Sequence, residues 1–189
     1  MVESGYIGYV GDLMEMCVIW LMGPPLSGKT TLGKMLTRRM SQNGIRSIHL
    51  DSDVVRGVIF KTPSYSKSEK SIVYRILGLL ANYSIDMGYI PIVSATGNLK
   101  VYRRELEGVI QHPIVKILLR CDPRVLRERD YKGIYRGVVG SIDTVPGLGE
   151  PLDYDGEYDY VVDTESRSPV DSLNDLLSIV ESILNISLS

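Results

Sequence analysis

The stretch Trp20-Leu21-Met22-Gly23-Pro24-Pro25-Leu26-Ser27-Gly28-Lys29-Thr30-Thr31 joins a short apolar run to the start of a helical pattern. Within it, residues 23–30 have the form G-x-x-x-x-G-K-T. Glycines at both ends let the backbone turn tightly, so that successive N–H groups point into one concavity at the positive end of the following helix. Such a concavity binds phosphate oxygens, and the motif therefore predicts a nucleotide-binding loop.

Each polar residue at the end of this motif has its own predicted role. Lys29 supplies a point charge for the β- and γ-phosphates, so we assign it to catalysis as well as to nucleotide binding. The Thr30 hydroxyl is placed to hold Mg²⁺. The predicted phosphate contacts are Gly23, Pro24, Pro25, Leu26, Ser27, Gly28, Lys29, Thr30 and Thr31.

Strand and helix patterns alternate on both sides of the loop. Strands are expected at 17–22, 47–50, 89–94, 113–120 and 158–162, and helices at 30–42, 66–87, 99–111 and 169–184, with another starting at Asp122-Pro123. The run 89–94 is almost continuously apolar, which is typical of a parallel strand buried on both faces. We therefore predict an α/β fold of the P-loop NTPase type, with about five mostly parallel strands and helices on both faces.

The length of 189 residues suits one domain, here 1–189. Residues 1–16 are expected to form an N-terminal extension, and residues 131–156, rich in glycine and proline, a lid or binding loop. The net charge of −2 gives no general reason to bind nucleic acid, and no apolar run reaches the roughly 18 residues that span a membrane. Cys17 and Cys121 indicate reduced, buried residues of a cytoplasmic protein.

Two carboxylates follow the second strand. Because parallel strands end at the same edge of a sheet, Asp51 and Asp53 should face the crevice that holds the phosphate loop. We assign Asp51 to Mg²⁺, through water, and Asp53 to orienting or deprotonating the hydroxyl that attacks the γ-phosphate. The alternative is that one or both only cap the helix that follows.

A group of residues downstream is predicted to contact the acceptor. Arg56 lies one turn after Asp53, where its fork of donors suits an anion. Tyr65 is expected to stack on a flat group and Arg75 to pair with an anion. A solvated arginine at 56, a core tyrosine and a helix-face arginine at 75 are the respective alternatives.

Residues 124–132 form the densest basic patch and lead directly into the glycine-rich loop. Phosphoryl transfer needs positive charge over the migrating group, so we expect Arg129 to contact the nucleotide and Lys132 the substrate. The alternative is an exposed helix with paired charges. Two isolated histidines, His49 and His112, are expected to be structural.

Three of these stretches together resemble the adenylylsulfate kinases: G-P-P-L-S-G-K-T-T-L at 23–32, L-D-S-D-V-V-R at 50–56 and R-D-Y-K-G-I-Y at 129–135. The resemblance covers about residues 18–164 and includes P-G-L-G-E-P at 146–151, similar to the family's T-G-I-D-x-P. It implies ATP-dependent phosphorylation of the 3′-hydroxyl of adenosine 5′-phosphosulfate, a step of sulfate assimilation, with Mg²⁺ and commonly as a homodimer. It also implies that Arg56 contacts the substrate, Tyr65 stacks on adenine and Arg75 holds the phosphosulfate.

The sequence departs from the family pattern on the acceptor side. Residues 95–98 read A-T-G-N where the family has F-I-S-P, and Val145 stands where the lid phenylalanine is usual. The family's D-R and N-I-R-R become E-K at 69–70 and V-Y-R-I at 73–76. A related kinase for another small hydroxylated metabolite is therefore the alternative, because D-x-D is also similar to shikimate and gluconate kinases. A signalling nucleotide switch is disfavoured, since no N-K-x-D motif is present.

Overall fold

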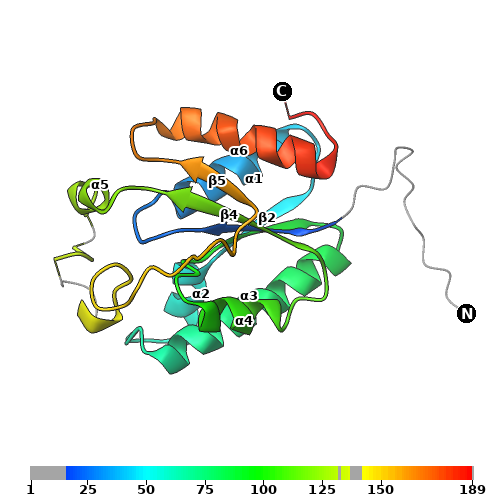
Figure 1. The fold of residues 1–189 in the computed structure, drawn as a ribbon. Coiled ribbons are helices and arrows are strands. Elements are labelled where there is room, and N and C mark those ends of the chain that lie inside the picture. The colour runs from blue at the N-terminus through cyan, green and yellow to red at the C-terminus, as the bar shows by residue number, and fades with distance from the viewer. Residues whose placement is uncertain (1–15, 132, 137–141, 189) are drawn as a thin grey trace, which may run out of the picture.

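The computed structural model describes residues 16–131, 133–136 and 142–188 (Figure 1). Its strands are β1 (Val18–Met22), β2 (Ser47–Asp51), β3 (Ile90–Ser94), β4 (Ile114–Arg120) and β5 (Tyr160–Asp163). They form one sheet in the order β2-β3-β1-β4-β5, and every neighbouring pair is parallel. The predicted α/β class is confirmed, and the strand that leads into the phosphate loop lies at the centre of the sheet.

Helices cover both faces of this sheet (Figure 1). They are α1 (Lys29–Gln42), α2 (Ser52–Ile59), α3 (Lys67–Asp86), α4 (Lys100–Glu107), α5 (Pro123–Glu128) and α6 (Pro169–Leu184), with a 3₁₀ turn at Ile142–Thr144. Along β1, Ile19 and Leu21 pack toward α1 and α6, whereas Trp20 and its neighbours pack toward α3 and α4. Burial on both faces explains why the central strand is apolar at every position.

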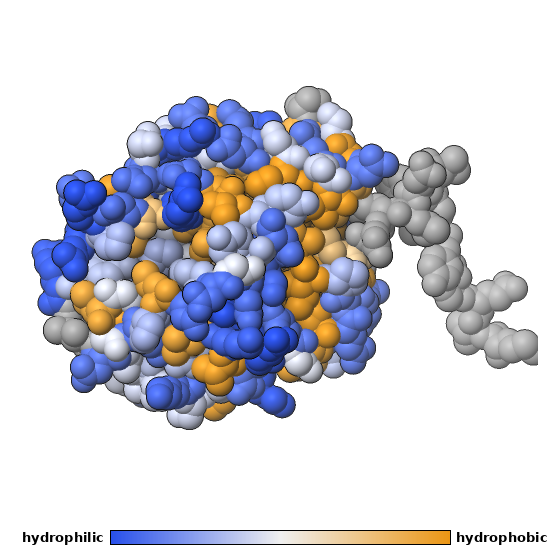
Figure 2. Space-filling model, in the orientation of Figure 1, coloured by the Kyte–Doolittle hydropathy of each residue, from blue (hydrophilic) through white to orange (hydrophobic). Residues whose placement is uncertain are grey.

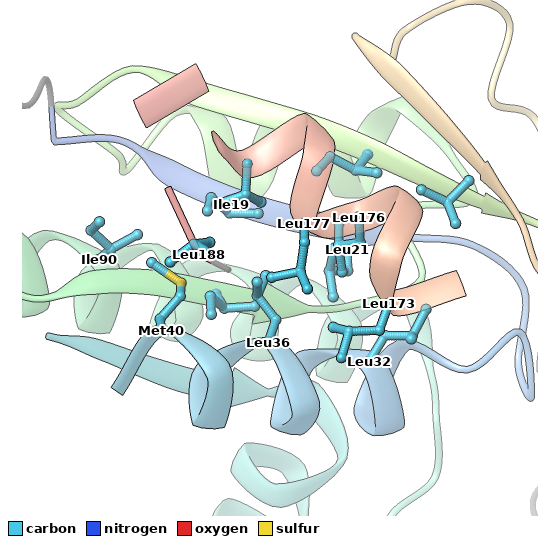
Figure 3. Packing of buried hydrophobic residues seen from close by; sticks show 14 of the residues in the cluster. Ile19, Leu21, Leu32, Leu36, Met40, Ile90, Leu173, Leu176, Leu177 and Leu188 are labelled. Carbon is cyan, nitrogen blue, oxygen red and sulfur yellow. The ribbon is translucent and has the colours of Figure 1, made fainter. Parts of the chain in front are cut away.

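The core between α1, α6 and the sheet fixes the helix that carries the phosphate loop. Leu32, Leu36 and Met40 lie four residues apart on α1 and share one core cluster with the leucines of α6 and with Leu188, which follows that helix (Figure 3). All three are at most 2% exposed. Each such side chain contributes about 1.5–3 kcal/mol relative to an exposed one, so the position of α1 on the sheet is strongly determined.

One face of the protein surface is mainly hydrophilic (Figure 2). Hydrophilic residues cover most of the face seen in Figure 2, with hydrophobic patches between them. Among the helices of the described residues, none has the length and apolar character needed to cross a membrane. Cys17 and Cys121 are both buried, as expected, and no disulfide joins them.

Some elements differ from the sequence-based expectation. The sequence pattern did not give the bounds of α2, a helix that begins directly after Asp51. The helix expected to end at 111 ends at Glu107, because Gly108 follows as its C-cap. Within the loop expected at 131–156, the described part holds the 3₁₀ turn and a bridge between Pro146 and Glu150. Residues 132 and 137–141 of that loop lie outside the described residues.

Candidate active site

A cavity of about 610 Å³ lies where the phosphate loop meets the carboxyl ends of β2 and β3. Its walls also come from the start of α3, the segments after α5 and β5, and residues 144–146. Open parallel sheets bind ligands at this edge, and the volume is within the usual range for small-molecule sites. The cavity therefore has the place and the size that the sequence motif predicts for a nucleotide and an acceptor.

The phosphate loop depends on glycine at two places. Gly23 has φ +142°, and a Cβ atom there would lie 2.6 Å from the carbonyl oxygen of Leu119. Gly28, with φ +98°, is the N-cap of α1 and offers no side chain to the first N–H groups of that helix. These N–H groups are thus available to an anion. The Lys29 ammonium donates to the carbonyl oxygens of Gly23 (2.8 Å) and Pro24 (2.7 Å), which holds it within the loop.

Asp51 connects the phosphate loop to β2. Its Oδ2 accepts a hydrogen bond of 2.6 Å from the Thr30 hydroxyl, and its Oδ1 accepts one of 2.8 Å from the N–H of Asp53. Asp51 therefore caps α2, as the alternative interpretation held, and also reaches the threonine predicted to hold the metal. Hydroxyl and carboxylate oxygens are the ligands that Mg²⁺ prefers.

The oxygen pair suits a metal that is held partly by the nucleotide and by water. In the part of the chain that the structure describes, no group of three or more histidine, cysteine, aspartate or glutamate residues could hold a metal ion. Mg²⁺ usually keeps several waters and takes only one or two protein oxygens plus phosphates. Thr30 and Asp51 therefore suit Mg²⁺ better than an ion that the protein surrounds with several ligands of its own.

Arg56 contacts three side chains at the cavity. Its guanidinium lies 3.2 Å from Asp53 Oδ1 and 3.0 Å from Glu69 Oε1, and its Cζ lies 4.7 Å from the centre of the Tyr65 ring. The Glu69 contact is an ion pair without the alignment of a hydrogen bond. Arg56 is 6% exposed, whereas the Asp53 side chain is 55% exposed. The arginine is therefore fixed, and it orients a carboxylate that faces the cavity.

Glu69 fixes the backbone that presents Tyr65. Its Oε2 accepts hydrogen bonds from the N–H of Ser64 (2.7 Å), the Ser64 hydroxyl (2.8 Å) and the N–H of Tyr65 (3.1 Å). Burial raises the pKa of Glu69, but these bonds and the charge of Arg56 outweigh it and lower the pKa below its ordinary value. Tyr65 has φ +57°, a conformation that needs such support. The carboxylate thus holds the ring in the cavity wall.

The family model for adenylylsulphate kinase matches residues 15–163. The chain belongs to the adenylylsulphate kinase family. It is 32% identical over 157 residues to a probable adenylyl-sulfate kinase of Archaeoglobus fulgidus, covering 79% of this chain and 97% of that protein. It is also 32% identical over 136 residues to an adenylyl-sulfate kinase of Rippkaea orientalis, covering 71% and 75%. Members of this family are phosphotransferases, and this chain is one of them.

A longer relative and two solved structures complete the comparison. The chain is 29% identical over 171 residues to a probable bifunctional SAT/APS kinase of Sorangium cellulosum, but spans only 29% of its length. The Mycobacterium tuberculosis APS kinase CysC, in complex with AMPPNP and APS, has a TM-score of 0.78 at 21% identity, over 89% of this chain and 98% of that one. A gluconokinase of Sinorhizobium meliloti has a TM-score of 0.60 at 16% identity, over 89% and 93%. These likenesses show the fold alone.

The residues that the sequence predicted for this adenylylsulphate kinase site are not all brought together. Arg129 lines the cavity, and its guanidinium donates to the carbonyl oxygens of Thr164 (2.7 Å) and Glu165 (3.0 Å). Arg75 is not among the cavity residues. Its side chain is 65% exposed, and its Nη1 atom lies 3.7 Å from Glu105 Oε2. Lys132 lies outside the described residues.

Lys70 and Glu150 belong to motifs that are altered from the family pattern, and both are buried beside the cavity. The Lys70 ammonium donates to Glu150 Oε2 (2.8 Å) and to the carbonyl oxygen of Thr144 (2.9 Å). Glu150 also accepts from the Asn98 amide (2.7 Å) and the Tyr102 hydroxyl (2.8 Å). Burial lowers the pKa of Lys70, and the Glu150 carboxylate opposes that shift. In the sequence, a lysine and a glutamate 80 residues apart give no sign of this pairing.

The glycine at position 97, where the family usually has serine, has a steric reason. A Cβ atom on Gly97 would lie 3.0 Å from Met22 Sδ and 3.1 Å from the Trp20 ring, and φ is +61°. The N–H of Gly97 donates to the Tyr74 hydroxyl at 2.7 Å. Burial raises the pKa of this tyrosine to about 12, so it stays protonated. Tyr74, which packs against Trp20 and Tyr102, thus gives the cavity a buried aromatic wall.

Proposed function

We propose that the chain transfers the γ-phosphoryl group of ATP to the 3′-hydroxyl of adenosine 5′-phosphosulfate, giving 3′-phosphoadenosine 5′-phosphosulfate and ADP. One observation supports the catalytic assignment most directly. Asp53 is held by Arg56 at the cavity, next to the Asp51–Thr30 contact of the phosphate loop. Membership of the adenylylsulphate kinase family supports the choice of acceptor.

In the proposed reaction each residue has a defined task. The loop N–H groups and Lys29 bind the phosphates of ATP, and Arg129, which lines the same cavity, contacts the nucleotide. Asp53 accepts the proton of the acceptor hydroxyl. The hydroxyl oxygen forms a bond to the γ-phosphorus, and the bond from that phosphorus to the bridging oxygen of ADP breaks. Arg56 holds the carboxylate in the orientation that this proton transfer needs.

The hydroxyl of Thr30 and the carboxylate of Asp51 would hold Mg²⁺, the carboxylate through water. When bound, this ion neutralises charge on the transferring phosphoryl group.

On the acceptor side, we assign adenine stacking to Tyr65 and anion contact to Arg56, both of which line the cavity. From its place in the sequence we assign Lys132 a substrate contact, and we assign none to Arg75, whose side chain is exposed and faces Glu105. A homodimer and a cytoplasmic location remain proposals from the sequence.

The acceptor is tested by incubating the full chain with ATP, Mg²⁺ and one of three acceptors: adenosine 5′-phosphosulfate, shikimate or gluconate. ADP is followed in a coupled assay. We expect ADP formation that depends on adenosine 5′-phosphosulfate. If only shikimate or gluconate supports turnover, the proposed acceptor is wrong, although the chemistry stands.

The catalytic assignment is tested with Asp53→Asn, which keeps the shape of the side chain but removes the base. A positioned general base typically contributes 10²–10⁴-fold, so we expect kcat to fall by roughly 10²-fold or more while the Kd for ATP stays within about twofold. Lys29→Ala is the contrasting variant, since it should weaken ATP binding itself. Near-normal turnover of Asp53→Asn would contradict the role of this residue.

A further inference from the structure

The strand β2 reaches α1 through the side chains of Ser47, His49 and Asp51, and the proposed reaction uses only Asp51. Leu50 packs into the core toward α3, so the residues on either side of it, His49 and Asp51, face α1. Asp51 reaches Thr30, as described above. His49 Nε2 lies 2.8 Å from the hydroxyl oxygen of Ser94, the last residue of β3.

The direction of these hydrogen bonds follows from the number of protons. The Ser94 hydroxyl donates to the backbone carbonyl oxygen of Lys29 at 3.1 Å. A hydroxyl has one proton, so with that proton on the bond to Lys29, Ser94 Oγ accepts from His49 in the tautomer that carries its hydrogen on Nε2. A directed chain therefore runs from the imidazole through the serine to the backbone of the phosphate-loop lysine.

Gly33 gives the second, independent observation. It lies inside α1, where glycine is a poor helix former and its φ is not in the left-handed region. A Cβ atom at this position would lie 2.4 Å from His49 Nε2, 2.6 Å from His49 Cδ2 and 3.0 Å from Ser94 Oγ. The missing side chain therefore leaves room for the imidazole and the serine hydroxyl, which explains a residue that the helix itself disfavours.

We propose that His49 and Ser94 are positioning residues that hold the first turn of α1 for nucleotide binding. Lys29 and Thr30 are adjacent in that turn, so a shift of its backbone would displace the phosphate-binding lysine and the metal-binding threonine together. The inference rests on the proposed role of the phosphate loop, not on the identity of the acceptor. It predicts that changes at His49 affect the affinity for ATP rather than for the acceptor.

Two variants of His49 test the geometry. The amide nitrogen of glutamine reaches about as far as Nε2, whereas that of asparagine stops near the position of Nδ1. Binding of a non-hydrolysable ATP analogue with Mg²⁺ is measured by calorimetry without acceptor. Loss of a hydrogen bond costs about 1 kcal/mol, so His49→Asn should raise the Kd about fivefold and His49→Gln should stay within about twofold. Equal Kd values for the two variants, whether near wild type or raised, would overturn the proposal.

Gly33→Ala tests the same chain of hydrogen bonds from the side of α1. Its methyl group should displace the imidazole and raise the Kd of the analogue to the level of His49→Asn. In the His49→Asn background the same alanine should add no further increase, because the bond is already lost. A wild-type Kd for Gly33→Ala, or full additivity in the double variant, would show that His49 and Ser94 contribute packing alone and do not position α1. The midpoint of urea unfolding, measured for each variant, confirms that the compared proteins are folded.

Discussion

At the scale of single residues, the proposed acceptor side of the cavity depends on the shape of one guanidinium. Arg56 contacts two carboxylates and an aromatic ring at the same time, while only 6% of its surface is exposed. An arginine presents several donors in a plane and can stack on a ring, whereas a lysine is a point charge on a flexible stem. A lysine at position 56 would therefore supply the charge but could not contact Asp53, Glu69 and Tyr65 at the same time.

Arg56→Lys should impair the acceptor side selectively. Losing one charged hydrogen bond costs about 1.5 kcal/mol or more, so we expect the KM for adenosine 5′-phosphosulfate to rise about tenfold, with the KM for ATP within about twofold. Steady-state kinetics with each substrate varied in turn measures both constants. Arg104→Lys, at an exposed ion pair with Glu107, is the matched control. An equal rise in both KM values would show a general disturbance instead.

At the scale of elements, Glu150 connects a loop to three separate parts of the fold. Its carboxylate binds Lys70 of α3, Tyr102 of α4 and Asn98 after β3. The loop that it anchors carries Thr144, Val145 and Pro146 into the cavity wall. Because Lys70 and Glu150 are each less than a tenth exposed, the pair is buried, and removing one partner leaves the other charge without compensation.

Glu150→Gln should therefore destabilise the whole domain. Breaking a buried pair from one side typically costs about 3–5 kcal/mol, so we expect the free energy of unfolding to fall by about 3 kcal/mol. Urea denaturation measures this change. The double variant Lys70→Met/Glu150→Leu removes both charges and should recover part of the loss. A decrease of less than about 1 kcal/mol for the single variant would mean that the pair is effectively solvated.

At the scale of the whole molecule, the order of the strands decides which residues meet. Since β3 lies between β2 and β1, Asp51 and Ser94 end side by side, in register, next to the phosphate loop. The loop connects β1 to α1, and α1 is held by the core that it shares with α6. Binding at the loop is thus coupled to the packing of the central sheet, and the bound ligand should stabilise the entire fold.

ATP with Mg²⁺ should raise the melting temperature of the protein. At a ligand concentration of 100 times the Kd, binding contributes about 2.7 kcal/mol, which for a domain of this size corresponds to roughly 5–10 °C. Differential scanning fluorimetry with and without Mg²⁺ measures the shift. Lys29→Ala should show little shift at the same concentration. A shift of wild-type size in that variant would contradict the assigned role of the lysine.

The sequence by itself determined the phosphate loop and the α/β class, because these depend on local spacing and on apolar periodicity, and three of its motifs carried the resemblance to the adenylylsulphate kinases. It also indicated that Asp51 and Asp53 would face the loop, since strand ends share one edge. Only the tertiary structure decided that Arg75 is exposed while Lys70 is buried, and that Glu150, His49 and Gly33 have specific partners. These contacts join residues up to 80 positions apart, and which of them meet is set by the packing of helices on the sheet.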